Sequence, residues 1–314
     1  MSKPTGIASY FADFGNEAST KDGLMLRRKN VKFFLCEPLI GELLKTDQIK
    51  AIKTGANSGL KRHGLPPSDN IINLKERSFM MLKKDLTLRN PLRLLGKENQ
   101  DILSKGGFGA VLARAGVGKT AIMVQLSLET LLRGKNVLHV SLSDPVNKVS
   151  LWYKEVFHNL ADQYNAQQIN QLWESILHHR FIMTFKVEGF SVPKLEERLT
   201  DLTEQNIFSP DMIVIDGFPF DDDVEASLKQ LKVFAEANDL RIWFSVRTHR
   251  HQEPQSDGIP PQLAHIDDLF EVTIQLQPEG KNIHVKATKG GSADGSASGL
   301  ILDPSTMLMV TKSK

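Results

Sequence analysis

One stretch of this sequence combines glycine, lysine and threonine at the spacing that phosphate binding requires. It is Ala113-Arg114-Ala115-Gly116-Val117-Gly118-Lys119-Thr120, between an apolar run and a segment with helical apolar spacing. A glycine-containing loop between a strand and a helix is the setting in which a P-loop binds the phosphates of a nucleoside triphosphate. The glycines let backbone N–H groups face a phosphate, and the helix start adds further N–H groups and a positive dipole end.

Individual side chains of this loop are expected to contact Mg-ATP. Lys119 can reach the β- and γ-phosphates, and the Thr120 hydroxyl can hold Mg²⁺. Ala113 stands where the GxxxxGK[ST] pattern has its first glycine, a change that a negative φ angle tolerates. A chance glycine-rich turn beside a lysine is the alternative, which the flanking strand and helix disfavour. The expected nucleotide-binding residues are Ala113, Arg114, Ala115, Gly116, Val117, Gly118, Lys119, Thr120 and Ala121.

A second acidic position completes the expected metal site. The apolar run Met212-Ile213-Val214-Ile215 ends in Asp216. A buried strand of this kind, the Walker B arrangement, delivers its terminal carboxylate beside a P-loop, where Asp216 can hold Mg²⁺ through water. Many buried strands end in Asp, so the pattern is informative here because it follows a P-loop among alternating strands and helices.

The elements that must position these residues alternate along the chain. Strands are expected over 107–112, 136–142, 181–185, 212–215 and 241–246, and helices over 121–132, 149–179 with a break near Asn165, 192–204 and 224–238. Three C-terminal segments, 272–276, 283–287 and 300–310, indicate an antiparallel meander. This order predicts an α/β fold with a mostly parallel central sheet covered on both faces.

The residues before this domain differ in composition. We expect a flexible N-terminus over 1–30, and a small basic α/β or helical region over 31–90 that begins with a strand at 31–36 and contains helices over 38–53 and 73–84. Residues 1–100 carry 18 Lys or Arg and 10 Asp or Glu, a net charge of +8, whereas the remainder carries −6. A basic first third suits nucleic acid or another acidic partner, or a surface that docks on the acidic remainder.

Composition excludes several classes of protein. A single cysteine, Cys36, excludes an internal disulfide and cysteine-based zinc sites. The sequence has no apolar run long enough to span a membrane, and its first residues lack the basic and apolar pattern of a signal peptide. These features predict a cytoplasmic protein without a membrane span.

With these motifs described, residues 91–310 resemble the RecA-like ATPases, in the branch that holds KaiC and the DnaB-type replicative helicases. The P-loop of DnaB-type proteins also begins with Ala-Arg, as Ala113-Arg114 does. Segments 136–142, 213–216 and 243–250 are similar to the second strand, the Walker B strand and the sensor strand of that branch. The resemblance implies a RecA-like P-loop NTPase domain over 91–314, ATP and Mg²⁺ as cofactors, and a homo-oligomer, of which a hexamer is one form.

The resemblance also implies catalytic roles. Lys119 and Asp216 act on the phosphates and the metal, and Arg247 or Arg250 senses the γ-phosphate. Lys289 lies on the strand that, in those ring ATPases, reaches the nucleotide of a neighbouring subunit.

Two departures from the branch predict slow hydrolysis. Its water-activating Glu is replaced by Ser143, followed by Asp144, whose shorter side chain serves only if the turn shifts by one residue. Its Lys-x-Arg finger is replaced by Lys286-Ala287-Thr288, with Lys289 next, and a lysine lacks the guanidinium fork.

Three functions are consistent with these features. The first in rank is a KaiC-like ATPase that uses Mg-ATP to control oligomeric assembly or a protein partner, which the changed Glu position and the acidic loop 221–223 favour. The second is a recombinase- or helicase-related ATPase acting on nucleic acid, which the basic first third and the loop 247–251 favour. The third is an ATP-binding module with little or no turnover. Fold resemblance does not choose among them.

Overall fold

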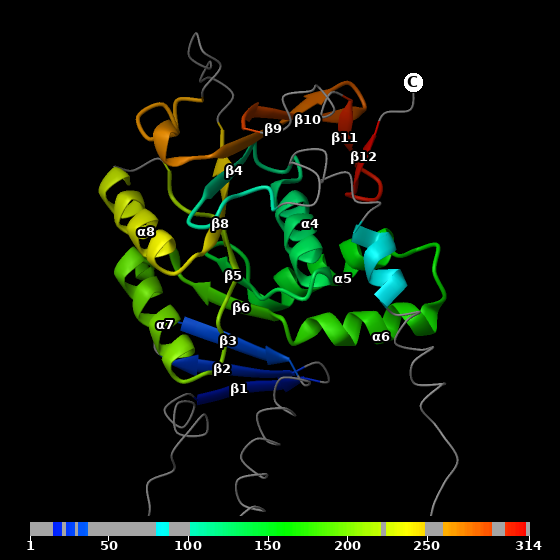
Figure 1. Cartoon of the computed structure of the whole chain (residues 1–314), viewed down its shortest axis with the longest axis horizontal. Helices are drawn as coiled ribbons and strands as arrows, with labels where there is room; N and C mark the ends of the chain where they lie inside the picture. The colour runs from blue at the N-terminus through cyan, green and yellow to red at the C-terminus, as the bar shows by residue number, and fades with distance from the viewer. Residues whose placement is uncertain are drawn as a thin grey trace, which may run out of the picture.

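A twelve-stranded mixed sheet forms the centre of the protein (Figure 1). The computed structural model describes residues 15–20, 23–28, 31–36, 80–87, 101–220, 224–248, 260–290 and 299–311. The strand order is β1-β2-β3-β6-β5-β7-β8-β4-β9-β10-β11-β12. The strands from β6 to β9 in this order run parallel, and the strands at both edges are antiparallel.

The element bounds follow the alternation expected from the sequence. The strands are β1 Gly15–Thr20, β2 Gly23–Arg28, β3 Val31–Cys36, β4 Phe108–Ala113, β5 Val137–Ser141, β6 Arg180–Phe185, β7 Met212–Asp216, β8 Arg241–Arg247, β9 Val272–Glu279, β10 Asn282–Lys289, β11 Leu300–Leu302 and β12 Met309–Thr311. The helices are α4 Lys119–Leu132, α5 Val146–Leu160, α6 Ala166–Leu177, α7 Val192–Glu204 and α8 Glu225–Ala237, with short 3₁₀ turns η2 Val187–Gly189 and η3 Asp267–Leu269 and a further helix over 80–87. The predicted α/β fold with a mostly parallel sheet and C-terminal antiparallel strands is confirmed.

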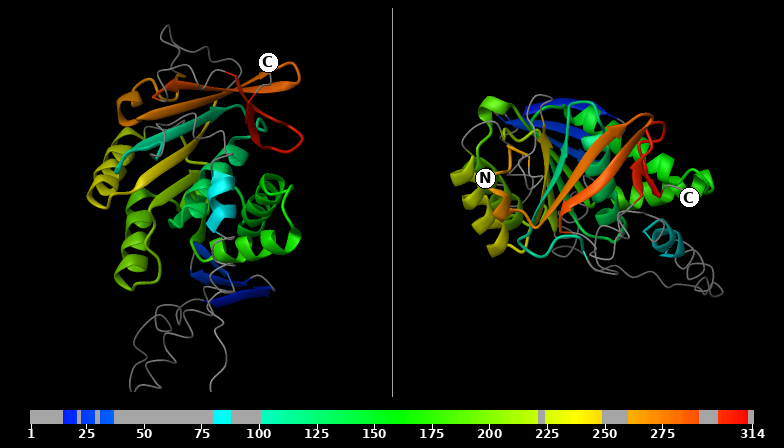
Figure 2. Two further views of the ribbon diagram at one scale, coloured as in Figure 1. Left: turned by 45° about the vertical axis from the view of Figure 1, so that its right-hand side comes forward. Right: turned by 90° about the horizontal axis from the view of Figure 1, so that it is seen from above.

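Helices cover both faces of the sheet. Helices α4, α5 and α6 lie on one face, and α7 and α8 lie on the other (Figures 1 and 2). Every residue of β4, β5, β6 and β7 is buried. Parallel strands covered on both sides are expected to be continuous apolar runs of this kind. Two hydrophobic cores result, one on each face of the sheet.

Helix α4 is delimited by glycines at both ends. Gly118 precedes it with a φ angle of 112°, and Gly134 follows it with a φ angle of 76°. The Gly134 N–H donates to Leu131 O at 2.9 Å, and the Lys135 N–H donates to Thr130 O at 3.2 Å. This pair of bonds is the Schellman motif, in which a left-handed residue ends a helix. The helix expected over 121–132 therefore ends at the predicted residue.

The N-terminal strands extend the sheet. The segment 1–30 contains β1 and β2, which pair antiparallel with each other. The expected strand 31–36 is confirmed as β3, and it pairs antiparallel with β6, so it continues the central sheet. The predicted helix 38–53 lies outside the described residues, as does the predicted start of the helix expected over 73–84. Residues 80–87 are helical.

The segment 300–310, expected as one strand, is a hairpin of β11 and β12. Pro304 lacks an N–H group and interrupts the strand. The Asp303 carboxylate accepts hydrogen bonds from the N–H of Ser305 at 2.9 Å and from its hydroxyl at 2.8 Å, and Met307 adopts a φ angle of 56°. This turn reverses the chain, so the single-strand prediction was wrong.

The β11–β12 hairpin is fastened to the two helices beneath it. The buried Gln125 side chain on α4 donates from Nε2 to Met307 O at 2.9 Å and accepts the Met309 N–H at 2.8 Å. Asn159 on α5 donates from Nδ2 to Thr306 O at 2.9 Å. One amide side chain thus satisfies both backbone groups that the turn directs toward α4.

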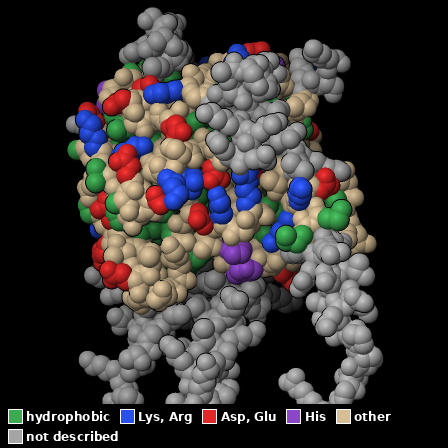
Figure 3. Space-filling view, viewed as in Figure 1, with side chains coloured by type: hydrophobic (Ala, Val, Ile, Leu, Met, Phe, Trp, Pro, Cys, Tyr) green, Lys and Arg blue, Asp and Glu red, His purple; other side chains and the backbone are tan. Residues whose placement is uncertain are grey.

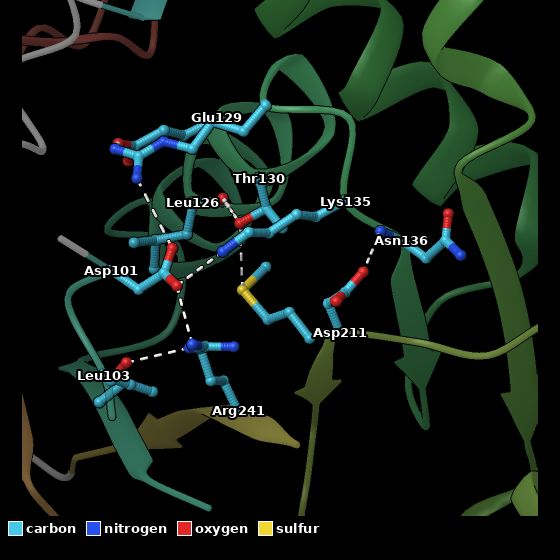
Figure 4. A network of polar contacts seen from close by, with 11 residues as sticks. Asp101, Leu103, Leu126, Glu129, Thr130, Lys135, Asn136, Asp211 and Arg241 are labelled. Carbon is cyan, nitrogen blue, oxygen red and sulfur yellow. Dashed lines mark hydrogen bonds and ion pairs between the residues drawn. The ribbon is translucent and has the colours of Figure 1, made fainter. Parts of the chain in front are cut away.

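A cluster of charges joins the segment before β4 to the C-terminal end of α4 (Figure 4). The Asp101 carboxylate lies 2.7 Å from Lys135 Nζ, 2.8 Å from Arg241 Nη2 and 3.6 Å from Arg133 Nη1. Burial pushes the pKa of Asp101 upward, but the Lys135 hydrogen bond and the three cations outweigh it and hold the pKa below its ordinary value. Arg241 also donates from Nε to Leu103 O at 3.0 Å.

Candidate nucleotide-binding site

The glycine-containing loop lies at the carboxyl edge of the parallel strands. It follows β4, which lies between β8 and β9 in the sheet. Ala113 is opposite Arg247 in the β4–β8 register, and the Thr248 N–H donates to Ala113 O at 3.0 Å. In open α/β sheets, ligands bind in the crevice outside the carboxyl ends of the strands. The fold therefore places residues 113–121 where a ligand site is expected.

The loop has the backbone conformation that its glycines allow. Gly116 and Gly118 have φ angles of 77° and 112°, which side-chain-bearing residues rarely adopt. Ala113 is not among the residues with positive φ, in agreement with the expectation that alanine is tolerated there. The first turn of α4 follows directly, and its N–H groups have no partners within the helix.

Lys119 folds back over this loop. Its Nζ donates to Ala113 O at 3.0 Å and to Arg114 O at 3.1 Å. Burial lowers the pKa of Lys119 below its ordinary value; the Asp216 carboxylate opposes this change and the Arg247 guanidinium adds to it. The ammonium group is therefore partly desolvated and held by two neutral carbonyls, an arrangement in which a phosphate would be a stronger partner.

The two residues expected to hold Mg²⁺ are in contact. Thr120 Oγ1 donates to Asp216 Oδ2 at 3.0 Å, although the residues are far apart in the sequence. The Asp216 side chain is buried at the end of β7. Its other oxygen, Oδ1, accepts from Ser245 Oγ on β8 at 2.5 Å.

This pair fits an ion that keeps most of its water. Mg²⁺ prefers oxygen ligands and is commonly held by one or two protein oxygens together with phosphates and water. The Thr120 hydroxyl and the Asp216 carboxylate supply such oxygens, next to the loop expected to bind phosphate. Within the described parts of the chain, no cluster of three or more His, Cys, Asp or Glu side chains could hold a metal ion without a phosphate.

Asp144, the expected water activator, lies in the turn between β5 and α5. Its carboxylate lies 2.9 Å from Lys148 Nζ, on the first turn of α5. The Asp144 N–H donates to Ser141 Oγ at 3.0 Å, and the Ser141 hydroxyl donates to Asp144 O at 2.9 Å. The backbone turn is therefore fixed by Ser141, and the carboxylate is bound to a neighbouring lysine.

The predicted charge-sensing residues have different outcomes. Arg247 is exposed at the end of β8, and its charge influences Lys119. Arg250 lies outside the described residues. Lys289 ends β10, and its Nζ lies 2.7 Å from both the backbone oxygen and the carboxylate of Asp267. Lys289 pairs opposite Thr273, near the start of β9, so it lies away from the P-loop of its own chain.

The first residues after β7 belong to the core. Phe218 and Phe220 are buried and pack against Phe244 on β8, with ring centroids 5.5 and 5.8 Å apart respectively. The acidic loop 221–223 that follows lies outside the described residues.

A buried polar group lies under the site. His139 on β5 is fully buried, and its Nδ1 lies 3.1 Å from the Tyr153 hydroxyl on α5. Burial lowers the pKa of His139 to about 4 and raises the pKa of Tyr153 to about 12. Arg180 on β6 lies over the Tyr153 ring, 4.7 Å from its centroid. The His139 and Tyr153 side chains are therefore uncharged at neutral pH.

Two residues of the site were missed from the sequence. Ser245 contacts Asp216, and Leu302 on β11 lies against Gly118. The signal for Ser245 was available, because β7 and β8 pair in parallel with Ile215 opposite Phe244, which places the next residues, Asp216 and Ser245, together. Leu302 could not be found, because the hairpin that carries it was not predicted.

No helix among the described residues is both long enough and apolar enough to cross a membrane. No model of a known protein family matches this chain, and no curated protein matches it with significance.

Proposed function

We propose that this chain is a RecA-like P-loop ATPase that binds Mg-ATP and uses slow hydrolysis to control its oligomeric assembly or a protein partner. The observation that carries the proposal is the 3.0 Å hydrogen bond from Thr120 Oγ1 to Asp216 Oδ2. It joins the residue that follows the P-loop lysine to the carboxylate at the end of β7. Nucleotide and metal sites of this class require that pairing.

The residues have separate roles in the proposed site. The N–H groups around Gly116 and Gly118 would face the phosphates, and Lys119 would exchange its two carbonyl partners for phosphate oxygens. Thr120 and Asp216 would hold Mg²⁺, which supplies neutralisation of phosphate charge. Each role uses a group that already lies at the carboxyl edge of the sheet.

Slow turnover follows from the surroundings of Asp144. Its carboxylate forms an ion pair with Lys148 at 2.9 Å, so it must leave that partner to orient a water molecule. A protein with slow hydrolysis suits a switch between assembly states better than a motor. The same contact also favours another candidate function, an ATP-binding module with little or no turnover.

An ATPase that acts on nucleic acid is the remaining candidate function. On the face seen in Figure 3, basic and acidic side chains of the described residues lie side by side across the middle of the molecule. Mixed charges give a weaker attraction for a phosphate backbone than a surface of one sign. The exposed Arg247 remains the local feature that favours this candidate.

Calorimetric titration with Mg-ATP tests the proposed site. Lys119→Ala should abolish binding, whereas Lys105→Ala, which removes an exposed lysine paired with Asp239, should leave binding unchanged. Equal binding by wild type and Lys119→Ala would refute the assignment.

Light scattering with simultaneous phosphate release separates the candidates. ATP-dependent growth in mass with phosphate release supports the assembling ATPase. Binding without growth or release supports the binding-only module. For nucleic acid, the logarithm of the binding constant for a single-stranded oligonucleotide should fall linearly with the logarithm of salt concentration.

A further inference from the structure

We infer that Ser245 is a positioning residue that fixes the metal-binding carboxylate of Asp216 and the backbone turn after it. This inference rests on the proposed function, because it assigns Ser245 to the Mg²⁺ site. The residue lies on β8, and its side chain is 3% exposed.

The two hydrogen bonds of Ser245 have defined directions. The Gly217 N–H donates to Ser245 Oγ at 3.0 Å. A carboxylate can only accept hydrogen bonds, so the hydroxyl proton of Ser245 goes to Asp216 Oδ1, 2.5 Å away, while its oxygen accepts from Gly217. Charge-assisted hydrogen bonds of this type are short and stronger than those between neutral groups. Ser245 therefore binds the side chain of Asp216 and the backbone of its neighbour.

These bonds divide the two oxygens of Asp216 between separate tasks. Oδ1 is held by Ser245, and Oδ2 is directed at the Thr120 hydroxyl. Turning the carboxylate out of its present plane would weaken both contacts. The oxygen next to Thr120 is consequently oriented before any metal binds, and outer hydrogen bonds of this kind raise metal affinity by orienting the ligand.

The same hydroxyl also sets the turn at Gly217. This residue has a φ angle of 90°, and a Cβ there would lie 3.3 Å from Ser143 Oγ. Ser143 occupies the position where the RecA-like branch is expected to have its water-activating residue. Ser245 thus aligns the metal ligand at the end of β7 and fixes the backbone of the next residue, which faces Ser143.

A Mn²⁺ titration of the protein with ATP tests this role. In Ser245→Ala, the affinity for Mn²⁺ in the presence of ATP should fall about tenfold, which is the lower end of the loss seen when outer-shell partners are removed. The affinity for ATP in EDTA should stay unchanged, because the phosphate-binding loop is intact. A hydroxyl with a purely structural role would leave the metal affinity unchanged.

Matched variants control for the loss of a buried hydroxyl. Ser127→Ala removes a buried hydroxyl on α4 that donates to Met123 O, and it should leave Mn²⁺ affinity at the wild-type value. Ser245→Cys keeps the shape of the side chain with a weaker donor and should have intermediate affinity. If Ser245→Ala does not fold, the Cys variant decides the question.

The outcomes distinguish the inference from the function on which it rests. Wild-type protein that fails to bind ATP would overturn the proposed function. Wild-type protein that binds ATP and Mn²⁺, with Ser245→Ala or a folded Ser245→Cys equal to it in Mn²⁺ affinity, would overturn the positioning role alone.

Discussion

The side chain of Leu302 lies directly over the α-carbon of Gly118. A Cβ at position 118 would come within 2.4 Å of Leu302 Cδ2. The P-loop is therefore in contact with the β11–β12 hairpin as well as with its own helix. At Gly116, which also has a positive φ angle, a Cβ would meet nothing within 4 Å.

Gly118→Ala should consequently destabilise the fold more than Gly116→Ala. Both substitutions strain the backbone by about 1–3 kcal/mol, but only the first adds overpacking of a further 1–3 kcal/mol. Urea unfolding of the single and double variants with Leu302→Ala measures the coupling. We expect the double variant to be more stable than the sum of the single losses predicts. Simple additivity would contradict the contact.

Removing the Gln125 amide should loosen the β11–β12 hairpin. Gln125→Leu leaves the part-buried Met307 O and the buried Met309 N–H without their partner, at a cost of about 1–3 kcal/mol for the buried N–H and less for the oxygen. Hydrogen exchange of residues 300–311 should accelerate. Gln125→Glu can still accept the Met309 N–H, but it places a buried carboxylate beside Met307 O, so its effect should be at least as large. Unchanged hydrogen exchange in Gln125→Leu would show that the Gln125 amide does not hold the β11–β12 hairpin.

The Asp101 cluster should contribute more stability than an exposed ion pair. Asp101→Asn removes the charge shared by Lys135, Arg241 and Arg133, and we expect a loss of about 2 kcal/mol. Asp239→Asn breaks an ion pair whose side chains are 62–63% exposed, and such pairs contribute less than about 1 kcal/mol. Thermal unfolding in low and high salt compares the two. Equal losses would mean that the cluster adds nothing beyond a surface pair.

Burial of His139 should make the protein less stable in acid. Its pKa is about 4 in the folded state and 6.5 when unfolded, so the unfolded state binds the proton first as the pH falls. The contribution is fully present above pH 6.5, and the free energy of unfolding should decrease by about 3 kcal/mol between pH 6.5 and pH 4.

The matched variant is His139→Asn, whose amide can hydrogen-bond the Tyr153 hydroxyl in place of Nδ1 but does not titrate. Denaturant unfolding at pH 7, 6, 5 and 4 should show a steeper loss for wild type than for this variant. Parallel pH profiles would exclude His139 as the cause.

The parallel core of the fold could be predicted from the sequence because its strands are continuous apolar runs and its helices have amphipathic apolar spacing. In addition, Asn165 caps α6 by accepting the Gln167 N–H, at the break expected from the sequence. The glycine-containing loop 113–120 and Asp216 could be singled out for the same reason: they lie at the ends of such strands.

The remaining features depend on contacts between distant segments. The β11–β12 turn is stabilised by Asp303 and by Gln125 on α4, and no local pattern indicates the second contact. The pairing of β3 with β6 likewise depends on which strand lies at the edge of the parallel part of the sheet, and the local sequence of β3 does not indicate that strand. The ion pair between Asp144 and Lys148 follows helical spacing, yet the sequence analysis assigned Asp144 to water activation alone.

The place of β4 between β8 and β9 has a consequence for how the chain acquires its fold during synthesis. Both partners of β4 leave the ribosome long after β4 and α4 do. Until then, one of the most apolar parts of the nascent chain has no neighbour to pair with and is exposed to aggregation or to chaperones. The strand β4 is therefore synthesised early but acquires both of its partner strands late, after most of the other strands of the sheet have been synthesised.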